Sequence, residues 1–153
     1  SARGSGQSSC RRGRGEGGGD LHAAAGPGLL QEEIHDHPDG CPTGEARTTS
    51  GHNLPARWII HTVGPRWNGG HQGEPELLAS CYRESLQAAV VIGARSVAFP
   101  AISTKAFGYP PAEAAPVAVN SVRAFLARDD HQTAEVILVG FNGESFGLYE
   151  DLL

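Results

Sequence analysis

The chain has 153 residues, with 12 basic and 17 acidic side chains and a net charge of −5. This length allows one domain with its own hydrophobic core, and the acidic balance does not favour a polyanion, so we expect no nucleic-acid partner. A small anion held by backbone amides remains compatible with that charge. Three cysteines without a C-x-x-C pair argue against a disulfide framework and fit the reducing cytoplasm. No apolar run is long enough to cross a bilayer and the N-terminus has no apolar signal core, so we expect no membrane partner.

Residues 1–19 are rich in glycine and arginine and contain no aliphatic side chain larger than alanine. This composition predicts a disordered tail that forms neither strand nor helix, followed by a single domain over residues 20–153. GC-rich coding DNA gives the same composition when it is read in the wrong frame. We therefore hypothesise that the tail is out of frame, with a single-nucleotide insertion or deletion near Leu21.

Helical and strand-like patterns alternate along the rest of the chain. The expected helices cover residues 29–36 and 74–92, a second long helix that carries its apolar pattern over 115–126 after the helix-opening Pro110-Pro111, and a closing turn at 146–153. The expected strands cover 46–49, 56–63, 96–99 and 135–139. Strands separated by helices of a dozen or more residues imply βαβ crossovers. The sequence therefore predicts an α/β fold with a mostly parallel sheet between two helical layers.

The segment between Phe99 and Pro110 has the features of a binding loop. Ser103, Thr104 and Gly108 are small, and backbone amides just before a helix N-terminus can converge on an anion. Phe107 and Tyr109 supply flat apolar faces beside that anion. A phosphate site next to surfaces on which a ring can stack suggests a nucleotide ligand. The alternative is an ordinary loop whose two aromatic rings pack into the core. Ligands of parallel sheets bind at the C-terminal ends of strands, where the turn at 140–143 is also expected.

Six segments in fixed order carry a resemblance to a known family. They are Ala24-Ala25-Gly26-Pro27, Cys41-Pro42-Thr43-Gly44-Glu45-Ala46, Asn53-Leu54-Pro55-Ala56-Arg57, Ile60-His61-Thr62-Val63-Gly64-Pro65, Leu78-Ala79-Ser80-Cys81-Tyr82 and the loop from Phe99 to Pro110. From about Leu21 to the C-terminus the chain resembles a macrodomain (Appr-1″-p processing family) of the ADP-ribose-binding, O-acetyl-ADP-ribose deacetylase type.

The resemblance implies a site for ADP-ribose. The main-chain amides of one loop would wrap the diphosphate, with an aromatic ring against the distal ribose at Phe107. After the last strand, Phe141 would flank the adenine, with Asn142 beside it. The loop residues concerned are Ser103, Thr104, Lys105, Ala106, Phe107 and Gly108. We expect a monomer without cofactor or metal, whose partners are ADP-ribose, its derivatives or ADP-ribosylated protein.

The sequence also departs from the family pattern. Lys105 stands where family members usually have glycine, and a Cβ there could hinder close approach to phosphate if the position needs a positive φ. The family's first two strands, asparagine-rich turn and glycine loop ending in Gly-Val-Asp are not present as such. Gly18 falls at the place of that aspartate, and Asp20 replaces a small residue. We therefore expect an N-terminally incomplete macrodomain and assign no catalytic residue.

Three functions remain open at this point. The first is an enzyme in which bound water attacks an ester at the distal ribose, oriented by the diphosphate loop. The second is a catalytically inactive module that binds ADP-ribose or ADP-ribosylated protein. The third is a truncated product that binds nothing. The family lineage favours the first, and the missing aspartate favours the second.

Other motifs suggest rival sites. Residues 143–147 match G-x-S-x-G, the nucleophile elbow of α/β-hydrolases, but no histidine follows Ser145 as that fold requires. Residues 35–37 with Cys41 could ligate zinc, yet no fourth ligand lies close in the sequence, which favours a polar helix end. His61 lies in an otherwise apolar strand and is predicted to be a hydrogen-bonded core histidine.

Overall fold

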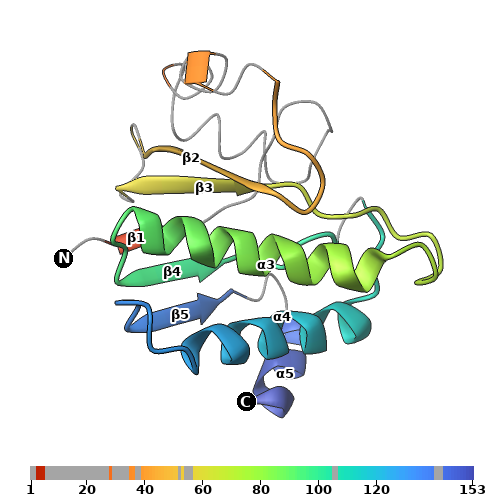
Figure 1. The fold of residues 1–153 in the computed structure, drawn as a ribbon. Coiled ribbons are helices and arrows are strands. Elements are labelled where there is room, and N and C mark those ends of the chain that lie inside the picture. Colours follow the sequence, from red (N-terminus) through yellow and green to blue (C-terminus); the bar gives the residue numbers. More distant parts are fainter. Residues whose placement is uncertain are drawn as a thin grey trace.

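The computed structural model describes residues 3–5, 28, 35–36, 39–51, 53, 57–104, 107–139 and 143–153. Strands and helices alternate along most of this part of the chain, as the sequence predicts. The elements are β1 (Arg3–Ser5), β2 (Ala46–Ser50), β3 (Trp58–Thr62), α3 (Glu74–Val91), β4 (Ser96–Phe99), α4 (Pro111–Leu126), β5 (Glu135–Leu138) and α5 (Gly143–Leu152) (Figure 1). Of the helix expected over 29–36, only residues 35–36 are described, and they are helical. Among the described helices, none is both long and apolar enough to cross a membrane.

The strands form two neighbouring sheets. In the first, β4 lies between β1 and β5, and all three strands are parallel. In the second, β2 pairs with β3 in the antiparallel direction. β1 also contacts β3, so the two sheets lie side by side (Figure 1). Parallel pairing confirms the βαβ interpretation for β4 and β5, whereas the antiparallel pair was not anticipated.

β1 corrects the prediction for the N-terminal segment. We expected residues 1–19 to form no strand, but Arg3–Ser5 pairs with Ser96–Ala98 of β4. The ladder is built from backbone groups, so a short segment can pair even without apolar side chains. The rest of residues 1–19 lies outside the described part of the chain, and its out-of-frame origin stays a prediction.

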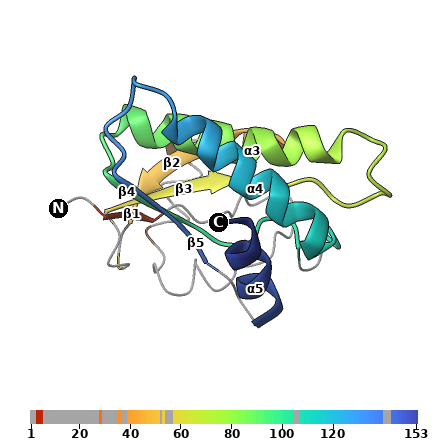
Figure 2. The same ribbon diagram turned by 90° about the horizontal axis from the view of Figure 1, so that it is seen from below.

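Helices α3 and α4 cover the same face of the sheet (Figures 1 and 2). Each buries an apolar stripe at helical spacing, as the sequence predicts. The stripe of α3 includes Leu78, Cys81, Tyr82, Leu86 and Ala89, and that of α4 includes Ala115, Ala118, Val119, Val122 and Phe125. Gly93 follows α3 with a φ of 71°, the left-handed conformation of a C-terminal cap.

The C-terminal elements differ from the prediction in two ways. The strand expected at 135–139 is one residue shorter, and it is half-exposed: Ile137 and Val139 are 45% and 47% exposed. Val136 and Leu138 pack against the core instead, so only one face of β5 is covered. The closing turn expected at 146–153 is a longer helix, α5, which packs against α4 and carries Tyr149 into the core.

Three connections meet at one edge of the sheets. β4 and β5 end together, because the Val139 N–H donates a hydrogen bond of 2.8 Å to the Phe99 carbonyl. The segment after β3 reaches the loop that follows β4, where the Trp67 N–H donates a bond of 2.8 Å to the Phe107 carbonyl. The predicted binding loop therefore lies at the C-terminal edge of the parallel strands. The turn at 140–142 is outside the described residues.

Candidate functional site

The loop after β4 is a closed turn with unusual backbone geometry. The Tyr109 N–H donates a bond of 3.0 Å to the Ser103 carbonyl, which closes the loop. Gly108 has a φ of 72°, which glycine adopts freely. Ser103 has a φ of 67°, which costs a residue with a Cβ on the order of 1–3 kcal/mol. Such strain concentrates at binding sites, where the surrounding structure maintains it.

The side chain of Ser103 is buried without a hydrogen-bond partner. Ser103 is only 7% exposed, and its Oγ contacts no donor or acceptor within the described part of the protein. Gly64, just after β3, packs directly against it. A Cβ added at Gly64 would overlap Ser103 Oγ and lie 2.6 Å from Ile102 Cγ2. Glycine at this position therefore leaves room for the loop.

Phe107 lines a pocket of about 510 Å³ beside this loop. The pocket is bounded by residues 41–43, by residues 63–66 at the end of β3, and by part of the segment that leads into α3. The guanidinium carbon of Arg66 lies 5.1 Å from the centre of the Phe107 ring, a cation–π arrangement. The pocket thus combines one flat aromatic face with polar and charged groups.

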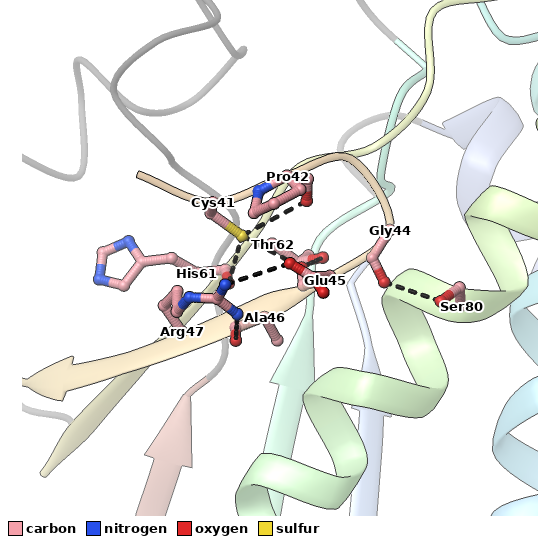
Figure 3. Close-up of polar contacts among 9 residues, drawn as sticks. All are labelled: Cys41, Pro42, Gly44, Glu45, Ala46, Arg47, His61, Thr62 and Ser80. Carbon is pink, nitrogen blue, oxygen red and sulfur yellow. Dashed lines mark hydrogen bonds and ion pairs between the residues drawn. The ribbon is translucent and has the colours of Figure 1, made fainter. Parts of the chain in front are cut away.

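The turn at residues 41–46 forms one wall of the pocket and is held by hydrogen bonds (Figure 3). Ser80 of α3 donates to the Gly44 carbonyl at 2.8 Å, and Thr62 Oγ1 of β3 donates to the Glu45 carbonyl at 2.7 Å. Cys41 Sγ lies 3.3 Å from the same Glu45 carbonyl. Since these bonds come from two different elements, the wall is fixed to both β3 and α3.

Glu74, the first residue of α3, binds the loop at the other side of the pocket. Its Oε2 accepts bonds of 3.0 and 2.7 Å from the amides of Asn68 and Gly70, and its Oε1 accepts one of 2.6 Å from Gln72. Burial raises the pKa of Glu74, but the amide donors lower it by more, to about 2. Glu74 is therefore a carboxylate at neutral pH.

The two aromatic residues of the binding loop have different environments. Tyr109 is 1% exposed, and its ring centre lies 4.6 Å from that of Trp67. Burial raises the pKa of Tyr109, and the nearby carboxylates of Glu113 and Glu74 raise it further. The core alternative thus applies to Tyr109, whereas Phe107 is half-buried at the pocket.

The structure brings together part of the predicted site. The described members, which share one loop, are Ser103, Thr104, Phe107 and Gly108. Those outside the described residues are Lys105, Ala106, Phe141 and Asn142. Sequence reasoning missed Arg66 and Glu74, although a glycine-rich segment before an acidic helix start was a usable signal for the latter.

The structure also bears on the three rival motifs of the sequence. Gly143 begins α5, so the G-x-S-x-G segment is helical and does not form a strand-to-helix elbow. Within the described residues no three potential metal ligands come together; His35 is exposed and bonds to Asp36, and His37 is not described. His61 is 1% exposed, with its Nε2 2.8 Å from Thr49 Oγ1, which confirms the predicted core histidine.

Comparison with known proteins decides the family. The Macro domain family model matches residues 9–118. The chain belongs to the macro domain family. This match includes residues 9–20, where the sequence alone showed us no resemblance, and the domain boundary at residue 20 stays a prediction. The predicted α/β macrodomain fold is confirmed by the similar structures below.

Named relatives and solved structures agree with this assignment. A macro domain-containing protein of Methanosarcina mazei is 53% identical over 127 residues, which are 83% of this chain and 66% of the relative, so the chain spans just under two thirds of that protein. An O-acetyl-ADP-ribose deacetylase of Citrobacter koseri is 49% identical over 88% of this chain and 77% of its own length. A mutant of the Oceanobacillus iheyensis macrodomain, solved with ADPR, has a TM-score of 0.84 and 36% identity over 99% of this chain and 84% of its own.

Proposed function

We propose that this macro domain binds ADP-ribose at the loop after β4. The observation that carries the proposal is Ser103, in a closed loop beside Phe107: its backbone is left-handed, and its buried hydroxyl has no hydrogen-bond partner among the described residues. Strain and an unpaired polar group are costly, and a ligand that binds there offsets part of that cost. A related macrodomain solved with ADPR supports the same ligand class.

The geometry suggests how the ligand is held. The loop amides precede the N-terminus of α4, where the helix dipole favours a diphosphate. Phe107 would lie against the distal ribose, with the 510 Å³ pocket on its side of the loop. The adenine contacts of Phe141 and Asn142, and the backbone contacts of Lys105 and Ala106, stay predictions. The same site would accept derivatives that carry an acyl group or a protein on the distal ribose.

Within this function, we place the chain in the lineage that hydrolyses O-acetyl-ADP-ribose, because a relative at 49% identity bears that name. The reaction would release acetate as water attacks the ester carbon. An inactive binding module is the second candidate, favoured by Gly18 at the expected place of the aspartate. Incubation with O-acetyl-ADP-ribose and product analysis separates them: ADP-ribose released above the uncatalysed rate supports the enzyme, and intact substrate supports the module.

Isothermal titration calorimetry tests the binding itself. ADP-ribose should give a saturable one-to-one isotherm, and AMP, which lacks the diphosphate and the distal ribose, should bind at least about tenfold more weakly. Folded protein that gives no heat of binding with ADP-ribose would overturn the proposal.

A further inference from the structure

The segment between β3 and α3 has little rigidity of its own. Gly69, Gly70 and Gly73 all adopt positive φ values, of 91°, 85° and 78°. Gly69 and Gly73 have nothing within 4 Å of an added Cβ, so side-chain packing does not hold them. The three amide bonds to Glu74, described above, therefore help to hold the glycine-rich middle of this segment in place.

The same segment is attached to the proposed ligand loop at three points. The Trp67 N–H donates to the Phe107 carbonyl, the Trp67 ring packs on Tyr109, and the Arg66 guanidinium lies over the Phe107 ring. Gly70 lies under the Trp67 ring, because an added Cβ would be 2.8 Å from that ring. A displacement of residues 66–72 would therefore move the backbone that carries Phe107.

We propose that Glu74 is a positioning residue, whose buried carboxylate sets the place of Phe107 through the segment 66–72. Glu74 lines the pocket, but both of its carboxylate oxygens already accept backbone amides, so we assign its effect on the ligand to this segment and not to a direct hydrogen bond. The carboxylate is the right group for this task, since it accepts all three N–H bonds and donates none. The functional consequence rests on the proposed function, because Phe107 is the residue expected against the distal ribose.

The test compares Glu74→Gln with Glu76→Gln, an exposed acid in the same first turn of α3. Glutamine keeps one acceptor oxygen and places an amide NH₂ where the second should accept. Amide hydrogen exchange without ligand should quicken at least about tenfold in both 66–72 and 103–109 in Glu74→Gln, and in neither segment in Glu76→Gln. Faster exchange in 66–72 alone would overturn the coupling.

A second variant keeps the test decisive if Glu74→Gln does not fold. Gly70→Ala leaves Glu74 intact but forces the Trp67 ring to move, and it should quicken exchange in 103–109 as well.

Titration with ADP-ribose then separates this inference from the proposed function. Absence of binding by wild type contradicts the function, while the exchange data still decide the coupling. Where wild type binds, Glu74→Gln should raise the dissociation constant about tenfold, and an unchanged constant would overturn the positioning role.

Discussion

At Gly108 the constraint on a side chain is conformational and not spatial. A Cβ added at Gly108 would meet no atom of the described residues within 4 Å. The strain comes from the φ of 72°, which a β-branched residue adopts poorly. Gly108→Val should therefore distort the loop and weaken ADP-ribose binding at least about tenfold, as measured by calorimetry.

Gly93→Val is the matched control for this change. Gly93 has a nearly identical φ of 71° and an open Cβ position, but it ends α3 away from the loop. Both variants should lower the melting temperature by a few degrees, roughly the cost of one strained residue. If the two variants lose affinity equally, Gly108 has no special part in the site.

Phe107 offers the second test at a single residue. Phe107→Ala removes the flat face at the pocket and should weaken ADP-ribose binding about 5- to 30-fold, which corresponds to about 1–2 kcal/mol. Phe146→Ala, at an aromatic residue that is 58% exposed on α5, should leave the affinity unchanged. An unaltered dissociation constant in Phe107→Ala would remove this ring from the site.

Some residues of the candidate site could be predicted from the sequence, and others could not. The small residues and Phe107 of the loop could be identified because they follow one strand and precede one helix. Arg66 could not, because its role depends on a contact with a loop that is distant in sequence, whereas Glu74 was missed although its bonds to the amides of residues 68–72 are local. The left-handed backbone of Ser103 was also hidden, since serine gives no local signal for a positive φ.

Among the elements, α3 and β4 were predicted almost to the residue. Their boundaries are marked locally, by the apolar period of the helix, by Gly93 and by the short β-branched strand. β1 was not predicted, because its place beside β4 depends on backbone pairing across most of the chain. β5 was predicted as a strand but not as half-exposed, since an apolar run does not show which face is covered.

The junction of α3 with its preceding loop should be sensitive to acid. The pKa of Glu74 is about 2 in the folded protein and 4.5 without the fold, so the unfolded chain binds the proton first. Its contribution to stability is complete above pH 4.5 and is lost as the pH falls towards about 2. Urea unfolding should show a steeper loss of stability across this window in wild type than in Glu74→Gln. Parallel curves for the two proteins would contradict the role of these hydrogen bonds.

The segment that follows β3 packs on the loop after β4, and this contact gives a further prediction. Gly64→Ala places a methyl group against Ser103 Oγ and Ile102, so the loop must shift or the fold must loosen. We expect a destabilisation of about 1–3 kcal/mol by urea unfolding, together with weaker ADP-ribose binding. Gly147→Ala in α5 is the control, because Gly147 has no positive φ and an added Cβ there meets no atom of the described residues within 4 Å. Equal effects of the two substitutions would contradict the close contact between Gly64 and Ser103.

At the scale of the whole molecule, the candidate site lies at one edge of the sheets. The C-terminal ends of β4 and β5 meet there, and the pocket beside Phe107 opens next to them. The acidic net charge of −5 does not oppose an anionic ligand at this edge, because backbone amides and a helix N-terminus supply the local positive potential. Composition alone does not favour a polyanion partner, and it could not locate this site.

A crystal structure of the protein with ADP-ribose tests the central claim most directly. We expect the diphosphate to lie within hydrogen-bond distance of the amides in the loop 103–108, with the distal ribose against the ring of Phe107. Ser103 Oγ should gain a partner from the ligand or from an ordered water beside it. ADP-ribose bound elsewhere, for example in the pocket that Arg83 of α3 and Asn120 of α4 help to line, with the loop after β4 unoccupied, would contradict the account.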